Sequence, residues 1–495
     1  MQTEKGIGES LSFWLFFSRI RKDKEQRNGL TKEPDIVYTE MQKTKRYAKE
    51  VIKQPKDKNR RNGRSMVRYY LAIDIGASSG RHIVGWPEDG KIRTVEVYRF
   101  PNGMKETDSG LIWDLDTLVM NIRMGIEEAL KRYPDIVSLS VDTWGVDYVL
   151  MKGDREILPC YAYRDSRTGP AIPEVHKRIP FEELYRRTGI QHQPFNTIYQ
   201  LYADQMAGRL AEADNFLPMP SYLMYRLCGG KAHEYTEATT GGMVNAQTGE
   251  YDPAILDALG FPRHLFPKLR KPGAVIGAYR GMKVVLCATH DTASAVEAIP
   301  MKGNELFLSS GTWSLLGMKL PAPLTDRKSM EADYSNEGGV GCSLYLKNII
   351  GMWLVNRLRE ELCPGKPWDE ITAEAEQDGF DGLVDAEDPD FLAPDSMKEA
   401  FDAKLTERPD CAAGYFRCAY RSLADTYGRA VRTMENSTGI RCSKLYIVGG
   451  GAKNNYLNRL TAKATGKQVA ALPMEATAAG NIKVQIRADR QEAGK

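Results

Sequence analysis

The hydrophobic residues of this chain form short runs and amphipathic stretches that alternate through most of the sequence after Val67. The run Tyr69–Ile75 predicts a buried β-strand, and a turn of small residues separates it from a second short strand in HIVGW. Apolar residues spaced four apart predict a helix over residues 116–133. The same criteria predict strands at 138–142 and 146–151 (paired around TWG), 283–289, 306–309 and 444–448, and helices at 292–299 and 455–465. This alternation is typical of an α/β fold.

Two segments of the chain resemble each other. IDIGASSGRHIVGW, near residue 74, and FLSSGTWSLLG, near residue 308, each predict a strand, a small-residue turn and a second strand. A break near residues 300–304 separates the halves that these segments open. We therefore expect two domains, 66–300 and 301–495, that face each other across a cleft, where small ligands usually bind.

Composition and charge restrict the class of protein. Hydrophobic residues make up 42% of the 495 residues and charged residues 27%, which is ordinary for a globular protein and excludes a fibrous repeat. Residues 1–65 hold 17 basic against 9 acidic residues, whereas the remainder holds 51 against 56. A nucleic-acid-binding protein would carry its basic surface on the folded part, so we expect no nucleic-acid partner.

The basic leader, residues 1–65, is predicted to be a disordered extension. Its apolar cluster, Phe13–Phe17, is far shorter than a membrane span and lacks the flanks of a signal peptide. A solvated tail, or a translation start placed upstream of Met66, accounts for the leader better than a role at an acidic surface. The eight cysteines form no Cys-x-x-Cys pair, which argues against a disulfide scaffold or a zinc site. We expect a cytoplasmic protein without a membrane partner.

Two small-residue turns are candidate phosphate sites. In Asp74–Arg81, backbone N–H groups and the hydroxyls of Ser78 and Ser79 can cradle phosphate oxygens, and Asp74 could hold Mg²⁺ through water. The lysine of a Walker A loop is absent, and a plain β-hairpin is the alternative interpretation. The segment Ser309–Ser314 repeats the pattern, so a polyphosphate could be held from two sides of one cleft.

A third candidate is the glycine run in Val448–Asn454, between a predicted strand and a predicted helix. Glycines let the backbone approach a planar or charged ligand, with the helix N-terminus behind it. The pattern is not G-x-G-x-x-G, so the dinucleotide fingerprint is not met. A tight turn without a ligand explains the run equally well.

The fourth candidate is Thr289–Thr292 (THDT), between a predicted strand and a predicted helix. Asp291 falls where a helix N-cap is expected, so capping alone could account for it. A helix dipole also favours the carboxylate form, which makes Asp291 a candidate general base next to the second phosphate turn. We favour the base because the other motifs accompany it.

A sugar site is predicted at DTWGVD, residues 142–147. Trp144 could stack on the face of a sugar while Asp147 binds its hydroxyl groups. A buried tryptophan with surface acids is the alternative. The histidines outside THDT share no spacing, so we assign them no role.

Together these motifs resemble the FGGY family of carbohydrate kinases. The resemblance runs from about Tyr69 to about Gln485 through AIDIGASSGR, SVDTWGVDYVL, YRDSRT, QPFNTIYQL, THDTASAV, LSSGTWSLLG, NEGG, KNIIGMWL and IVGGGAKN, in that order. DTWGVD, THDTASA and SSGTWSL are similar to the L-rhamnulose kinases of the family. The resemblance implies an α/β fold of two ribonuclease-H-like domains, as in actin-like ATPases, flanking a central cleft.

The resemblance also implies roles for individual residues. Those that would contact ATP are Ala77, Ser78, Ser79, Gly80, Arg81, Thr312, Asn348, Asn356 and Gly450. Those that would contact the sugar are Gly145, His290, Asp291 and Thr292, with Asp291 as catalytic base and with Trp144 and Asp147 beside them. Asn356 stands where the family can carry a glutamine, and its shorter side chain reaches less far toward a nucleotide.

The implied reaction is ATP-dependent phosphorylation of L-rhamnulose at its 1-hydroxyl, which gives L-rhamnulose 1-phosphate and ADP in L-rhamnose degradation. ATP and Mg²⁺ are the implied cofactors, a small-molecule ketose is the partner, and we expect a monomer or small homo-oligomer. Three alternatives stay open. They are a kinase for L-fuculose or D-xylulose, an inactive nucleotide-binding protein with a kinase fold, and an actin-like or chaperone-type ATPase without a sugar substrate.

The C-terminus departs from the family pattern. The match fades after Gln485 into IRADRQEAGK, which is polar and is predicted to have no core face. We therefore expect a truncated C-terminal domain with uncovered apolar surface, which would make the protein unstable or inactive.

Overall fold

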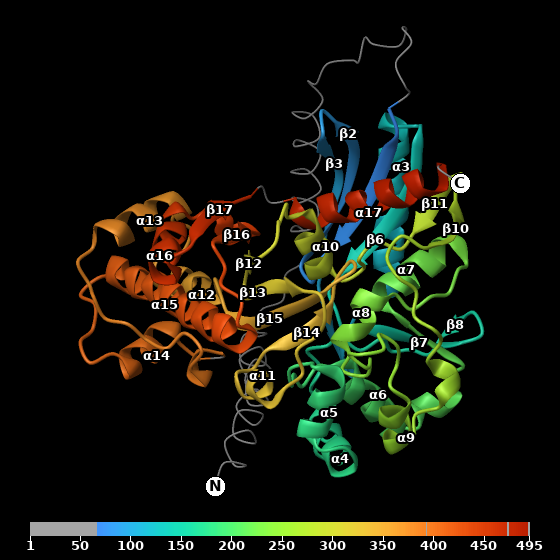
Figure 1. Cartoon of the computed structure of the whole chain (residues 1–495), viewed down its shortest axis with the longest axis horizontal. Coiled ribbons are helices and arrows are strands. Elements are labelled where there is room, and N and C mark those ends of the chain that lie inside the picture. The colour runs from blue at the N-terminus through green and yellow to red at the C-terminus, as the bar shows by residue number, and fades with distance from the viewer. Residues whose placement is uncertain (1–66, 393, 473–474, 494–495) are drawn as a thin grey trace, which may run out of the picture.

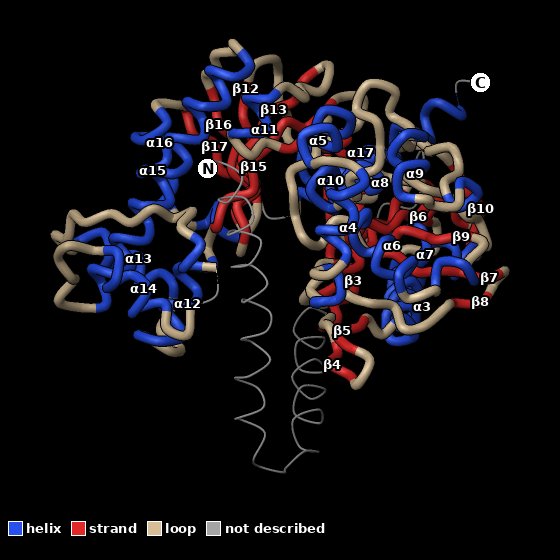
Figure 2. The backbone as a smooth tube through the Cα atoms, turned by 90° about the horizontal axis from the view of Figure 1, so that it is seen from below, coloured by secondary structure: helices blue, strands red, loops and turns tan. Residues whose placement is uncertain are grey.

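The computed structural model describes residues 67–392, 394–472 and 475–493, and they form two lobes, each built on a six-stranded mixed sheet (Figures 1 and 2). The predictions for the leader, 1–65, lie outside the described residues. Within the described ranges, no helix has the length and apolar character that crossing a membrane requires.

The first sheet has the strand order β10–β11–β6–β1–β2–β3. Its central strand β1 occupies Tyr69–Ile75 as predicted, pairs antiparallel with β2 and runs parallel to β6. The predicted helix is α3 (Leu115–Arg132), whose buried face includes Leu118, Ile122 and Ile126. The other strands of this sheet are β2 (Ser79–Glu88), β3 (Lys91–Pro101), β6 (Ile136–Thr143), β10 (Val275–Tyr279) and β11 (Met282–Val285).

The second sheet has the order β14–β15–β13–β12–β16–β17. Its strands are β12 (Glu305–Ser310), β13 (Trp313–Leu320), β14 (Ser335–Gly338), β15 (Ser343–Ile350), β16 (Lys444–Val448) and β17 (Gln468–Ala471). Its helices are α12 (Trp353–Leu362), α13 (Trp368–Gln377), α14 (Met397–Lys404), α15 (Ala412–Thr438) and α16 (Asn455–Thr465). The long helix α15 buries one face of aromatic and small residues in the core of this lobe.

The internal resemblance of the sequence is a resemblance of topology. In each sheet an antiparallel hairpin, β1–β2 or β12–β13, carries a parallel neighbour on its first strand, β6 or β16. A strand of this kind is buried on both faces, which explains the apolar runs at residues 69–73 of β1 and 445–448 of β16. The duplicated arrangement confirms the predicted α/β fold class.

The predicted pairing of strands 138–142 and 146–151 is wrong. Strand β6 already has β1 and β11 as neighbours, so it has no free edge. The chain turns away after Trp144, and β7 (Tyr148–Lys152) joins a separate sheet with β8 (Arg155–Glu156) and β9 (Asn215–Pro218). The helices around this sheet are α4 (Ala171–Arg178), α5 (Phe181–Thr188), α6 (Thr197–Met206), α7 (Met219–Cys228), α8 (Tyr235–Thr240) and α9 (Pro253–Leu259).

The last helix, α17 (Ala476–Ala493), crosses back to the first lobe and lies on strands β1 and β6 and on helix α10 (Asp291–Ala298) (Figure 1). Ile482 and Ile486 pack against apolar residues of β1 and β2, and Ala488 is buried as well. The prediction that the tail has no core face is therefore wrong, because a helix needs only one apolar stripe to pack. The remaining strands are β4 (Lys105–Thr107) and β5 (Gly110–Ile112), and the remaining α-helix of the described residues is α11 (Arg327–Glu331).

Candidate active site

Three carboxylates gather where the central strands of the first sheet end. Asp74 and Asp142 face each other in the parallel register of β1 and β6. The next residue of β6, Thr143, forms a parallel bridge with His290, which brings Asp291 to the same edge. Burial, and then the charge of Asp74, raise the pKa of Asp291 from its usual value to about 7. A carboxyl group of that pKa can exchange a proton near neutral pH, as a general base must.

Asp291 is the first residue of α10, and the N-cap is His290, which makes no side-chain capping bond. The alternative interpretation of Asp291 as the capping residue is therefore wrong. Its carboxyl group accepts a bond of 3.2 Å from the Thr292 hydroxyl. About a third of the side chain, 34%, is exposed to solvent, so a ligand can reach it.

Gly145 lies against the same group. A Cβ added at this glycine would lie 3.2 Å from the side chain of Thr240 and 3.4 Å from Cδ2 of His290. The next residue, Val146, has φ 71°, a conformation that costs energy for a β-branched residue. The hydroxyl of Thr197 donates to the Val146 carbonyl at 2.7 Å and stabilises that turn. The structure thus brings together Gly145, His290, Asp291 and Thr292, four of the residues assigned to the sugar.

Asp147 has a different role from the predicted one. Its carboxylate accepts hydrogen bonds from the indoles of Trp113 and Trp144, the backbone N–H of Tyr163 and the amide of Gln200. Only 1% of Asp147 is exposed, and the ring of Trp144 packs on that of Trp113 at 4.1 Å between centroids. Asp147 therefore braces the turn that holds Gly145, and neither it nor Trp144 presents the predicted surface to a sugar.

The first phosphate turn lies beside Asp74. The Gly76 N–H donates to the Ser79 carbonyl at 2.9 Å, which leaves Ser78 exposed at the tip. Asn102, which sequence reasoning missed, supports the turn through its amide, which donates to the Gly76 carbonyl at 2.8 Å. Arg81 points back to Asp74, with 2.6 Å between guanidinium and carboxylate. The pair orients Asp74 at the end of its strand.

The second turn and the glycine run lie together in the other lobe. A Cβ at Gly449 would be 2.7 Å from the Ser310 carbonyl, and one at Gly451 would be 2.0 Å from the Ser310 hydroxyl. Only glycine allows this approach of the run to the end of β12. Gly450, between them, is exposed, and a Cβ there would meet nothing within 4 Å. The Thr312 carbonyl accepts from two backbone N–H groups at the start of α12.

The two asparagines assigned to the nucleotide lie in the second lobe. Asn356 is in the first turn of α12, and its N–H donates to the Met352 carbonyl. Asn348 is on β15, and its amide donates at 3.2 Å to Gln191 of the first lobe. Asn348 therefore lies where the two lobes touch.

Two buried glutamates near Asp291 were not predicted. Glu234 caps α8 and accepts a 2.8 Å bond from the hydroxyl of Thr289, two residues before Asp291. Glu337, on β14 of the second lobe, has its carboxyl group 3.4 Å from His290 Nδ1. Neither residue has a sequence spacing that points to the site. Glu337 stands in the NEGG motif, which forms part of the family resemblance but carries no predicted role.

The carboxylates of Asp74 and Asp142 are suitable ligands for a hard cation such as Mg²⁺, which also binds phosphate oxygens. One oxygen of Asp142, Oδ1, is buried and has no hydrogen-bond partner among the described residues. Mg²⁺ is usually held by one or two carboxylates together with water and substrate phosphates. Asp74 and Asp142 fit that chemistry, although the described residues include no cluster of three metal-ligating side chains.

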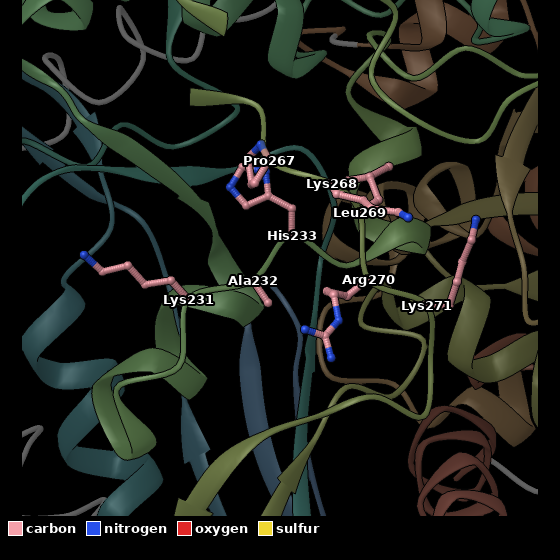
Figure 3. Close-up of a pocket in the computed structure, with 8 residues that line it drawn as sticks. All are labelled: Lys231, Ala232, His233, Pro267, Lys268, Leu269, Arg270 and Lys271. Carbon is pink, nitrogen blue, oxygen red and sulfur yellow. The ribbon is translucent and has the colours of Figure 1, made fainter. Parts of the chain in front are cut away.

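A cavity of about 560 Å³ lies elsewhere, between residues 231–233 and 267–271 (Figure 3). It has a basic lining, but the side chains of Lys231, Arg270 and Lys271 point away from one another. A site for an anion needs donors that converge, so this cavity is not the candidate active site.

Family models and known relatives both match this chain over most of its length. The model of the N-terminal domain of the FGGY family of carbohydrate kinases matches residues 69–290, and that of its C-terminal domain matches 306–488. A rhamnulokinase of Oceanobacillus iheyensis is 39% identical over 435 residues, which cover 84% of this chain and 93% of the relative. A rhamnulokinase of Bacillus subtilis is 36% identical over 441 residues, 85% of this chain and 90% of the relative.

Solved structures show the same fold at much lower identity. A ligand-bound xylulose kinase from Lactobacillus acidophilus has a TM-score of 0.74 at 15% identity, covering 86% of this chain and 90% of its own. A glycerol kinase from Plasmodium falciparum, solved with ADP, has a TM-score of 0.70 at 12% identity, with coverage of 86% and 90%. At this level of identity, these similarities show the fold alone.

Proposed function

Because the chain belongs to the FGGY family of carbohydrate kinases, we propose that it phosphorylates L-rhamnulose at the 1-hydroxyl, giving L-rhamnulose 1-phosphate and ADP in L-rhamnose degradation. The rhamnulokinases among its relatives support this choice of ketose. The observation that carries the proposal is the position of Asp291 at the start of α10, directly after His290, which lies against Gly145, and close enough to Asp74 of β1 for that charge to raise its pKa.

In this proposal Asp291 accepts the proton of the 1-hydroxyl as the sugar oxygen attacks the γ-phosphorus of ATP and ADP leaves in line. Phosphoryl transfer depends mainly on positioning and on neutralising charge. The backbone of Ala77–Gly80 would bind phosphate oxygens, and Thr312 and Gly450 would bind the nucleotide. Arg81, Asn348 and Asn356 complete the proposed ATP contacts. Residues 66–300 would thus hold the sugar and 301–495 the nucleotide.

Mg²⁺ would be held by Asp74 through water, with Asp142 behind it, and would neutralise the phosphate charge when bound. The chain itself supplies the orientation. Arg81 pairs with Asp74, and Asn481 of α17 donates to Asp142, so both carboxylates have fixed directions before a ligand arrives.

The proposed activity is tested by ADP release from MgATP with L-rhamnulose, L-fuculose, D-xylulose, glycerol or no sugar. We expect the highest kcat/KM with L-rhamnulose and little ADP release without sugar. A higher kcat/KM with another ketose would reject L-rhamnulose as the preferred substrate but would still support a sugar kinase. Equal ADP release with and without sugar would instead indicate an ATPase. A rise in melting temperature with ATP but no turnover would indicate a nucleotide-binding protein without kinase activity.

The first prediction concerns pH. A base with a pKa near 7 is protonated and inactive below that pH, so kcat/KM for the sugar should rise with pH and level off above about 7. Below pH 7 the slope of log kcat/KM against pH should be close to one. A profile that is flat between pH 5.5 and 8 would contradict the assignment of Asp291 as base. Enzyme held at pH 7.5 is diluted into each assay buffer, and its stability at that pH is measured alongside. Loss of activity by protonation is thereby separated from loss by unfolding.

The second prediction concerns Gly450. Because a side chain there would meet nothing in the protein, Gly450→Val should fold normally and obstruct only a bound nucleotide. We expect the KM for ATP to rise about tenfold, the loss of roughly 1.4 kcal/mol of binding, with the KM for sugar and the melting temperature unchanged. Gly379→Val is the matched control, since a Cβ at Gly379 also meets nothing. An unchanged KM for ATP in Gly450→Val would remove Gly450 from the nucleotide site.

A further inference from the structure

Glu337 belongs to the second lobe, yet its carboxyl group lies beside His290 of the first. Glu337 Oε2 is 3.4 Å from His290 Nδ1, and both side chains are nine-tenths buried. On the other side of the imidazole, Nε2 lies 3.5 Å from Oδ1 of Asp291. The three groups therefore form a row that ends at the proposed base, with His290 in the middle.

Strand β14, which carries Glu337, is tied to the first lobe on both sides of that residue. The Gly338 N–H donates to the hydroxyl of Thr239 at 2.8 Å. The Asn336 N–H donates to the Gly189 carbonyl, also at 2.8 Å. These bonds fix the backbone of Glu337 relative to α8 and to the end of α5. The distance from the Glu337 backbone to His290 is therefore fixed, and the glutamate side chain spans it.

The facing atoms of the pair lack other partners. Neither His290 Nδ1 nor Glu337 Oε2 has a hydrogen-bond partner among the described residues, although both atoms are buried. A buried polar atom without a partner is costly, and at 3.4 Å a small rotation of either side chain closes a hydrogen bond between these two. A small side-chain rotation is therefore enough to give both atoms a partner.

Burial favours the neutral form of both groups, whereas their interaction with each other favours the charged forms. Burial lowers the pKa of His290, and burial raises the pKa of Glu337. The titratable groups that face His290 are Glu337 from β14 and Asp291 from α10. The charge of Asp74 acts on Asp291. The pKa of Glu237 on α8 is raised first by burial, then by the charges of Glu234 and Asp291. A neutral imidazole has one donor and one acceptor nitrogen, and the partner of Nδ1 decides which nitrogen carries the proton.

We propose that Glu337 is a positioning residue for phosphoryl transfer: it holds His290 Nδ1, and so keeps Nε2 directed at Asp291 and at the sugar hydroxyl. The inference rests on the proposed function of Asp291. A ring that is not held at Nδ1 can flip, which places a carbon atom where Nε2 meets the base. Glu337 does not touch the reacting atoms in this scheme and acts only through His290.

A double-mutant cycle tests this dependence. Glu337→Ala should lower kcat by about 10- to 100-fold and leave the KM for ATP nearly unchanged. In the background of His290→Ala, the same substitution should cause no further loss, because the ring that it holds is already absent. An equal loss in both backgrounds, or no loss in either, would overturn the proposal.

Conservative variants keep the test decisive if Glu337→Ala fails to fold. Glu337→Gln retains the length and a hydrogen bond to Nδ1, so kcat should stay within about fivefold of the parent, whereas the shorter Glu337→Asp should lose as much as Glu337→Ala. If Glu337→Asp kept the parental kcat and Glu337→Gln lost it, the charge of the side chain would matter rather than its length, and the proposal would be overturned. Glu331→Gln, an exposed carboxylate on α11, is the control and should match the parent.

The failure of this inference is distinguishable from failure of the proposed function. If no sugar is phosphorylated by the unchanged protein, or if Asp291→Asn keeps full activity, the proposed function fails and Glu337 loses its role with it. If Asp291→Asn is inactive while the Glu337 variants keep the parental kcat, only the role of Glu337 is rejected.

Discussion

Replacing Asp291 by asparagine should lower kcat by about 10²- to 10⁴-fold, the largest catalytic loss that we expect from any single substitution in this chain. Asparagine has nearly the same shape but cannot accept a proton. The hydroxyl of Thr292 can still donate to the remaining side-chain oxygen, so the start of α10 should be preserved. The expected signature is a lower kcat with KM values within a few-fold of the parent, measured by coupled ADP release.

The same variant should not be less stable than the parent at pH 8. The pKa of Asp291 is raised in the folded protein above its unfolded value of 3.8, so the folded state disfavours the carboxylate. The stability that this group contributes is fully present below pH 4 and is lost as the pH rises through about 7. Asparagine avoids that loss, so the melting temperature at pH 8 should be equal or higher, and the difference should shrink toward pH 5.

Asp257→Asn is a suitable control for Asp291→Asn. Asp257 is an exposed aspartate on α9 that pairs with Arg263, and it lies outside the candidate site. Its variant should keep the parental kcat. Parental kcat in Asp291→Asn itself, with substrate saturation demonstrated, would reject Asp291 as the base. A lower melting temperature at pH 8 would show that Asp291 stabilises the fold instead.

The elements that could be predicted from sequence are those whose signal is local. The predicted limits of β1, β16 and α16 agree with the structure residue for residue, and in the structure Asn454 caps α16. The predicted strand 283–289 is shortened to β11, because the N–H of Cys287 donates to the Ser140 hydroxyl rather than to a neighbouring strand. The strand is therefore shorter than predicted because of Ser140, a residue that is distant in sequence.

The candidate site shows the same limit. Small-residue turns and THDT are contiguous in sequence, so their chemistry could be inferred from residue type. The role of Asp147 depends on donors from Trp113 and Gln200, which are 34 and 53 residues away, and no spacing reveals them. Glu337 meets His290 only because β14 of one lobe docks on α8 of the other. Contacts between lobes have no periodicity that a single sequence can display.

The contact of helices α10 and α17 leads to the second large effect. A Cβ at Gly480 of α17 would lie 1.8 Å from the backbone carbonyl oxygen of Ser294 on α10, and 3.1 Å from the Ala298 nitrogen. Neither backbone atom can move without shifting its helix. The residue after Gly480, Asn481, donates to Asp142, so a displaced α17 would also release a carboxylate of the candidate site.

We therefore expect Gly480→Ala to lower the free energy of unfolding by about 3 kcal/mol, the upper end of the usual cost of overpacking, and to lower kcat as well. Helix propensity alone predicts the opposite, a gain of about 1 kcal/mol for alanine within a helix, so the sign of the change identifies steric contact as the cause. Gly379→Ala, where the added methyl group meets nothing, should change stability by less than about 0.5 kcal/mol. Denaturant unfolding followed by intrinsic fluorescence would measure both variants. A stabilised, fully active Gly480→Ala would show that the two helices do not touch at this glycine, and that the fixed direction of Asp142 does not depend on their contact.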